Sequence, residues 1–134
     1  MNGMTWWLLP ILLFAWLLLW WVTRTKSLSE KDCSIILRKW KEVEALMEEK
    51  KYRDAVLEAD KTLDFAMKRM SISGETFAKR FTKAEKTIGR QEGVWVAHKM
   101  RNQLVHEIDF EITAGKAISA TNAFHHALKK LNAL

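Results

Sequence analysis

The chain contains no proline after Pro10, and its apolar residues recur at helical spacing and not in the alternation of strands. Glycines at positions 74, 89, 93 and 115 fall between the segments that show this spacing. No linker long enough to divide residues 30–134 into two domains is visible. We therefore predict an all-α fold in which residues 30–134 form one four- or five-helix bundle with a modest core.

The helix boundaries follow from capping residues and apolar spacing. Ser29 precedes the first apolar-periodic segment as an N-cap, and Asp32 lies in the first turn, where a negative charge is favourable. The predicted helices cover about 30–50, about 52–70, about 75–88, the segment around 100–107, and the segment after Thr113. The single cysteine, Cys33, lies in phase with Ile36, Leu37 and Trp40, so we predict that it is a small core residue.

Residues Trp6 to Val22 are uncharged and almost wholly apolar. With Thr5 and Thr23 they give about 19 residues, close to the roughly 20 that cross a bilayer as a helix. Tryptophans stand at both ends, where indoles settle at the headgroup level. Residues 1–5 contain no Lys or Arg, and no small-residue cleavage site follows, so a cleaved signal is disfavoured. We predict that residues 1–23 form a single transmembrane anchor.

The charges after this segment set a predicted topology. Arg24 and Lys26 follow it directly, and the positive-inside rule assigns them to the cytoplasm. Residues 24–29 would then be a short tether and residues 30–134 a cytoplasmic domain of a single-pass cell-membrane protein. The alternative is a core helix of a soluble protein, which is disfavoured because no other segment supplies a partner core for so much Trp and Leu.

Several function classes lack a candidate site. The net charge of +6 suits nucleic acid or anionic headgroups, yet 16 acidic residues are interspersed among 22 basic ones. One cysteine excludes an intrachain disulfide and a thiolate zinc site. The four histidines lack companions at metal-ligand spacing, so we predict no metal and no cofactor. A glycine-rich phosphate loop, a carboxylate pair and a serine elbow are also absent from the sequence.

The segment Met100–Glu107 contains the remaining candidate residues for a chemical function. Arg101 precedes His106 by five positions; arginine holds phosphate through a planar fork, and histidine transfers protons near neutral pH. On a helical wheel Arg101 falls inside the apolar arc that faces the core. The other members of that arc are Val94, Ala97, Met100, Leu104, Val105 and Ile108. A guanidinium there needs a partner: Asp60 or Asp64 as a structural ion pair, another chain, or a ligand phosphate.

A polar stripe runs beside that arc. His98, Asn102 and His106 follow at intervals of four residues, and Asp109 comes three residues later. An exposed polar stripe is ordinary by itself. Its combination with Arg101 on the apolar arc leads us to predict that His98 and Asp109 contribute to binding.

The string Arg101-Asn102-x-x-x-His106, in the penultimate helix of a small helical domain, resembles the signature of the HEPN superfamily. The residue-level match covers about one helix, and the architecture extends it over about 27–134. The resemblance implies a four-helix-type bundle that commonly forms homodimers in which two motif helices face each other. It also implies metal-independent RNA cleavage, binding of nucleotides or RNA, or a role as a partner module. Arg101 would hold the scissile phosphate, Asn102 would orient it, and His106 would be general base or acid at the ribose 2′-hydroxyl.

The geometry of a helix limits how Arg101 and His106 can act on one phosphate. Five residues separate Arg101 from His106 by roughly 140° around a helix and about 7.5 Å along it, so one straight helix does not aim both at one phosphate. A two-fold dimer through the motif helix would solve this. The predicted function is a membrane-tethered domain that binds RNA or a nucleotide and cleaves RNA without metal. The alternative is a non-catalytic, membrane-anchored interaction or dimerisation module, marked by an Arg101–carboxylate pair and a solvent-exposed His106.

Overall fold

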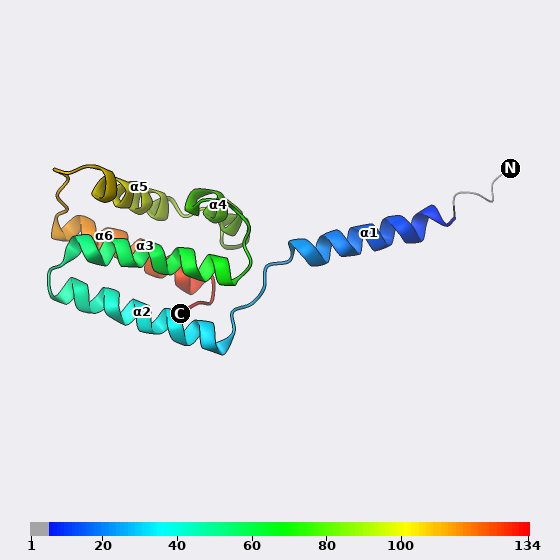
Figure 1. Cartoon of the computed structure of the whole chain (residues 1–134), viewed down its shortest axis with the longest axis horizontal. Coiled ribbons are helices and arrows are strands. Elements are labelled where there is room, and N and C mark those ends of the chain that lie inside the picture. Colours follow the sequence, from blue (N-terminus) through cyan, green and yellow to red (C-terminus); the bar gives the residue numbers. More distant parts are fainter. Residues whose placement is uncertain (1–5) are drawn as a thin grey trace.

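The computed structural model describes residues 6–134, and this part of the chain is all-helical, without strands (Figure 1). Its six helices are α1 (Leu8–Thr23), α2 (Glu30–Glu48), α3 (Tyr52–Arg69), α4 (Phe77–Ile88), α5 (Glu92–His106) and α6 (Ala114–Lys130). The all-helical prediction is therefore confirmed for the described residues, with α2–α6 forming the bundle.

Hydroxyl caps fix where three of these helices begin. The Ser29 side chain accepts a hydrogen bond from the Asp32 N–H, as predicted, and Thr113 caps α6 in the same way. Thr76 caps α4, which is why α4 begins at Phe77 and not at the predicted position 75. Gly93 and Gly115 lie inside the first turns of α5 and α6, so only Gly74 and Gly89 lie between helices.

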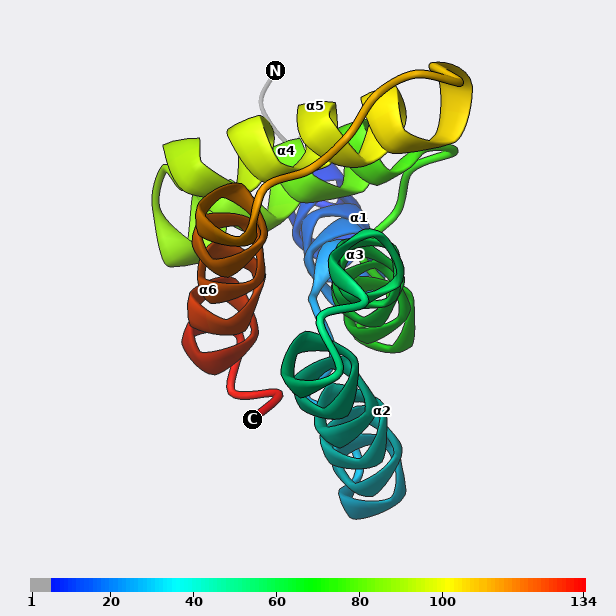
Figure 2. The same ribbon diagram turned by 90° about the vertical axis from the view of Figure 1, so that its left-hand side faces the viewer.

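The helix α3 lies at the centre of the bundle and contacts α2, α4, α5 and α6. Figure 2 shows α5 crossing over α3 and α6, with α4 on the same side of the bundle as α5. The core between these helices is apolar. Its largest fully buried side chains are Phe81, Phe124, Ile36, Leu63, Met67, Leu104, Leu128, Val43, Val56 and Val94. Their burial is the main stabilising contribution, because each removes apolar surface from water.

The predicted transmembrane anchor is wrong. The helix α1 has 16 residues, which at 1.5 Å per residue span about 24 Å, less than the roughly 30 Å of bilayer hydrocarbon. Trp6 and Trp7, counted toward the span in the sequence, form a turn before the helix. Among residues 6–134 no helix combines the length and apolarity needed to cross a membrane. The predicted single-pass cell-membrane location loses its basis with this finding, and residues 1–5 of the predicted anchor lie outside the described residues.

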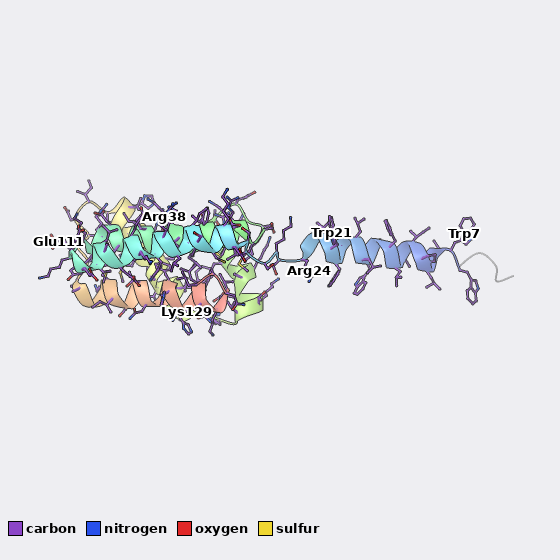
Figure 3. The ribbon with its side chains drawn as sticks, turned by 90° about the horizontal axis from the view of Figure 1, so that it is seen from below. Trp7, Trp21, Arg24, Arg38, Glu111 and Lys129 are labelled. Carbon is purple, nitrogen blue, oxygen red and sulfur yellow. The ribbon has the colours of Figure 1, made fainter. Side chains whose placement is uncertain are left out.

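The helix α1 extends away from the bundle (Figure 1), and side chains project from it on several sides (Figure 3). The side chains from Trp6 to Val22 are exposed, and none of them belongs to the buried core. Residues 24–29 connect α1 to α2 without helix. Within this connection the Lys26 N–H donates to the Met70 carbonyl over 2.9 Å, which attaches the connection to the end of α3.

Two apolar assignments also need correction. Because α5 ends at His106, Ile108 leaves the helix and is 99% exposed, although the wheel assigned it to the core-facing arc. Val105 lies in the last turn of α5 and is exposed as well. On α2 the predicted core face is narrower than expected: Cys33 is only partly buried and Leu37 is exposed.

Candidate functional site

A cavity of about 350 Å³ lies between α3, the beginning of α4, and α5. Its wall is formed by Asp60, Lys61 and Asp64 of α3, residues 75–78 and Arg80 at the start of α4, and His98, Arg101 and Asn102 of α5. Three of the five residues predicted for the site are thus brought together here.

Asp60 organises the deep side of this cavity. Its side chain is 5% exposed, and its Oδ1 lies 2.7 Å from Nδ1 of His98. Its Oδ2 lies 3.5 Å from Nε of Arg101, which is an ion pair too long for a good hydrogen bond. A carboxylate buried to this extent requires compensating partners, and here two side chains of α5 supply them.

The His98 ring is held on two sides. Its Nδ1 faces the Asp60 carboxylate, so this nitrogen carries the proton and donates. Its face stacks on Phe77 with ring centroids 4.1 Å apart and planes 13° apart. Among the described residues none makes a hydrogen bond with Nε2. In the neutral ring that nitrogen is an acceptor, in a side chain that lines the cavity.

Arg101 uses little of its donor capacity. Its Nη1 donates to Asn102 Oδ1 over 3.0 Å, while its Nε is buried without a hydrogen-bond partner. Within residues 6–134 no acceptor for Nη2 is found. The side chain is 28% exposed and lines the cavity. One donor on Nη1 is used and Nε is buried beside Asp60, so the donors left for a ligand are those of Nη2 and the second N–H of Nη1.

A second arginine closes the other side of the cavity. Arg80 is nearly buried and places Nε and Nη2 at 2.8 and 2.7 Å from Oδ1 of Asp64. Its Nη1 donates to the Gly74 carbonyl, which fastens residues 71–76 ahead of α4. The other Asp64 oxygen pairs with Lys68 at 2.7 Å. Asp64, one of the two predicted partners of Arg101, is thus occupied, and Asp60 is the partner in the structure.

The charges of the cavity wall balance. Asp60, Asp64 and Glu75 are the acidic residues of the wall, and each forms an ion pair with a basic side chain. The basic side chains of the wall are Lys61, Arg80 and Arg101. Because the carboxylates are already paired, their repulsion toward an anion in the cavity is reduced.

The other two predicted residues lie elsewhere. His106 is the last residue of α5, is exposed and does not line the cavity. Asp109 is exposed in the segment between α5 and α6. Within one chain, then, Arg101 and His106 do not converge, as the helix geometry predicts. The prediction that a second copy supplies His106 stays a prediction.

The sequence did not indicate Phe77, Arg80 or the other α4 residues of the wall as site residues, and it indicated Asp60 only as a partner for Arg101. A signal existed for Asp60, because it follows the buried Val56 by four residues and precedes the buried Leu63 by three. Asp60 is thus a negative charge on the apolar face of α3, and Arg101 is a positive charge on the apolar face of α5. For Phe77 no signal existed, since a phenylalanine at helical spacing reads as core.

A second cavity of about 390 Å³ lies between α2 and α6, away from Arg101. Trp40 and His125 stack there with centroids 4.8 Å apart. Burial lowers the pKa of His125 below its ordinary value; Lys129 acts in the same direction, and Glu44 opposes it. This cavity has no unpaired buried polar group, and its features are those of a structural stack.

Comparison with known proteins identifies no family and no relative for this chain. No family model, no curated protein and no solved structure matches the chain. The HEPN resemblance therefore stands on the motif of α5 and the helical architecture alone.

Proposed function

We propose that this chain is a helical domain that binds RNA or a nucleotide, with the phosphate held at Arg101 in the cavity between α3 and α5. The observation that carries the proposal is the unused donor capacity of Arg101, whose Nη2 and second Nη1 N–H have no acceptor among the described residues. An arginine fork binds phosphate through two parallel hydrogen bonds, which neither Asp60 nor Asn102 satisfies here.

The surroundings of Arg101 support a phosphate ligand. Asn102 receives a hydrogen bond from Nη1 and so fixes the plane of the guanidinium. The volume of about 350 Å³ is at the lower end of small-ligand sites, which suits one nucleotide unit and not a large cofactor. The net charge of +6 adds a long-range attraction for a polyanion.

Binding tests this proposal directly. The full chain, kept in a nonionic detergent because the apolar side chains of α1 are exposed, is titrated with fluorescent single-stranded RNA and with adenosine mono- and triphosphate. Arg101→Lys keeps the charge and loses the fork, so the Kd should rise about tenfold, which corresponds to about 1.4 kcal/mol. Lys99→Ala is the matched control, because Lys99 is exposed on the same helix outside the cavity.

Two results would contradict the proposal. The first is an absence of binding by the wild-type chain to RNA and to both nucleotides. The second is an equal loss of affinity in Arg101→Lys and Lys99→Ala, which would mean that the fork of Arg101 contributes no more to binding than one surface charge outside the cavity.

A second candidate function is a non-catalytic dimerisation module, which is favoured by three observations. Arg101 has an intramolecular carboxylate partner in Asp60, and His106 is exposed. The apolar Val105 and Ile108, on either side of His106, are also exposed. In this function the C-terminal end of α5 pairs with its copy. Sedimentation velocity of the detergent-kept chain should then give a dimer that Ile108→Glu dissociates, while Ile118→Glu, at an exposed position on α6, leaves it intact.

A further inference from the structure

We infer that α1 and the connection after it bind a lipid surface, with the apolar side chains of α1 among the acyl chains and an anionic phosphate headgroup in a cavity lined by Arg24 and Lys26. The inference goes beyond the proposed function, because it requires no ligand at Arg101. It concerns insertion of α1 into a lipid layer and not a crossing of the bilayer, for which α1 is too short.

The first argument is that α1 is apolar on every side. Residues 8–22 contain no polar side chain, and the exposed fractions of the large apolar side chains from Trp6 to Val22 run from 45% at Leu17 to 75% at Trp6. A helix that is apolar all round is stable where every face is removed from water. A groove on a protein partner covers one face of a helix and leaves the opposite face in water. Acyl chains surround a helix completely, so they fit α1 better than a groove does.

The second argument is a cavity of about 760 Å³ where α1 ends and the connection to α2 begins. Figure 3 shows Trp21 and Arg24 at this end of α1 and Trp7 at the opposite end. The cavity is lined by the apolar Trp21 and Val22, by the basic Arg24 and Lys26, and by three residues with hydroxyl groups. Apolar residues are thus followed directly by basic ones, in the order in which acyl chains are followed by phosphate groups in a lipid.

The third argument is the charge of this cavity. Among the described residues none that lines it is acidic, and no carboxylate forms an ion pair with Arg24 or Lys26. The guanidinium carbon of Arg24 lies 5.3 Å from the centroid of the Trp20 ring. A contact over the ring uses the face of the guanidinium, so its in-plane N–H groups remain for an anion. Two cations without carboxylate partners beside hydroxyl groups favour a phosphate group.

The fourth argument is that the connection is attached to the bundle. The Lys26 N–H donates to the Met70 carbonyl, and the next residue, Ser71, lines the cavity. The wall of the cavity therefore comes from the end of α1, from the connection and from the end of α3. A headgroup bound there contacts both the apolar helix and the bundle.

Partitioning into vesicles tests the inference. The full chain, diluted from nonionic detergent, is mixed with vesicles of phosphatidylcholine, or with vesicles in which part of this lipid is replaced by phosphatidylserine, and the fraction that floats with the vesicles is measured. We expect binding to both, and stronger binding to the anionic vesicles. Each basic residue at an anionic surface contributes about fivefold, so Arg24→Gln should lose about that factor, and Arg24→Gln with Lys26→Gln about 20-fold, on anionic vesicles alone.

The matched control is Lys116→Gln, which removes the same charge from an exposed position outside the cavity. The helix α6 begins at the end of the bundle farther from α1 (Figure 1), so Lys116 is screened from the surface and its loss should be less than about twofold.

Two further measurements test the contact with acyl chains and the source of the phosphate. Vesicles with brominated acyl chains should quench most of the tryptophan fluorescence, because five of the seven tryptophans lie in or beside α1. Leu13→Asn, which places an amide among the acyl chains, should lower partitioning into both kinds of vesicle by about tenfold or more. Inorganic phosphate, added at the concentration of the anionic lipid, should leave the chain on the vesicles.

Four results would overturn the inference. Equal partitioning into both kinds of vesicle would remove the headgroup, and equal losses in Arg24→Gln and Lys116→Gln would remove the cavity. Displacement by inorganic phosphate would make free phosphate the ligand. A chain that stays out of the vesicles and sediments as an oligomer would mean that further copies cover α1. Because no RNA or nucleotide is present, each of these results leaves the proposed function at Arg101 unaffected.

Discussion

Asp60 Oδ1 and His98 Nδ1 lie 2.7 Å apart although the two residues are 38 positions apart in the chain. This contact joins α3 to α5 across the cavity, and the second oxygen of the same carboxylate faces Arg101. One buried acidic group thus sets the positions of two side chains of the cavity wall, so changes at Asp60 affect stability and function together.

Removal of the Asp60 carboxylate should destabilise the bundle. Asp60→Ala leaves Arg101 without its ion-pair partner and His98 Nδ1 without an acceptor. Breaking a buried pair from one side costs several kcal/mol, and the partial exposure of Arg101 reduces this to about 2 kcal/mol. Urea unfolding monitored by circular dichroism gives the value. Glu58→Ala, which removes a surface ion pair two residues earlier on α3, should cost less than about 1 kcal/mol; equal losses in the two variants would contradict the prediction.

A side chain at position 74 should disturb the cavity wall. A Cβ there would lie 2.8 Å from the Arg80 backbone nitrogen, and the φ of +154° is one that residues other than glycine rarely adopt. Gly74→Ala should therefore cost about 1 to 3 kcal/mol. Gly115→Ala is the opposite case, because no heavy atom lies within 4 Å of its Cβ and the site is helical. It should stabilise the protein by about 0.5 kcal/mol in the same unfolding measurement.

Stability should depend on pH through His125. Because its pKa is lower in the folded protein, the unfolded chain binds more protons in the range from the ordinary value of 6.5 downward. Its contribution is therefore unfavourable below that range, and the free energy of unfolding rises with pH through it. His125→Phe keeps a ring on Trp40 and removes the titration, so between pH 7.5 and 5.5 it should lose less stability than wild type. An identical loss of stability in wild type and in His125→Phe would mean that His125 is not the cause of the pH dependence.

The salt dependence of RNA binding should show the contact between Arg101 and one phosphate. For single-stranded RNA, log Kobs falls with log salt concentration by about 0.7 per neutralised phosphate. Arg101→Ala should reduce that slope by about this amount, and Arg101→Lys should retain the slope while weakening binding at every salt concentration. Fluorescence anisotropy measures the RNA affinity at salt concentrations from roughly 50 to 200 mM, the range over which such slopes are resolved. A slope that Arg101→Ala leaves unchanged would place the phosphate elsewhere.

The helices of the bundle were predictable because their signals are local. Ser29 and Thr113 mark the starts of α2 and α6, and the apolar spacing of α3 and α4 shows directly in the sequence. The anchor prediction failed for a different reason. It counted apolar residues, whereas crossing a bilayer requires helical length, and the first two tryptophans of the run form a turn before α1.

The cavity was predictable only in part. Arg101 stood out because a charge on an apolar helical face needs a partner, and Asp60 was one of the two carboxylates proposed. His98 was assigned to binding, but its orientation by Asp60 and Phe77 depends on how three successive helices pack against one another. The exposure of Val105 and Ile108 depends on where α5 ends, and no capping residue in the sequence marks that end.

The hydrogen bond from Lys26 to Met70 determines where a mechanical load on α1 would enter the bundle. Tension on α1 would be shared at Lys26 between this hydrogen bond, to the last residue before the 71–76 loop, and the covalent chain that continues through residues 27–29 into α2. That loop carries Gly74, which Arg80 holds, and Thr76, which caps α4 at the edge of the cavity. A single hydrogen bond breaks at a smaller load than the covalent chain, so a pull on α1 would release the connection from the end of α3 before it disturbs the cavity wall or the helix packing.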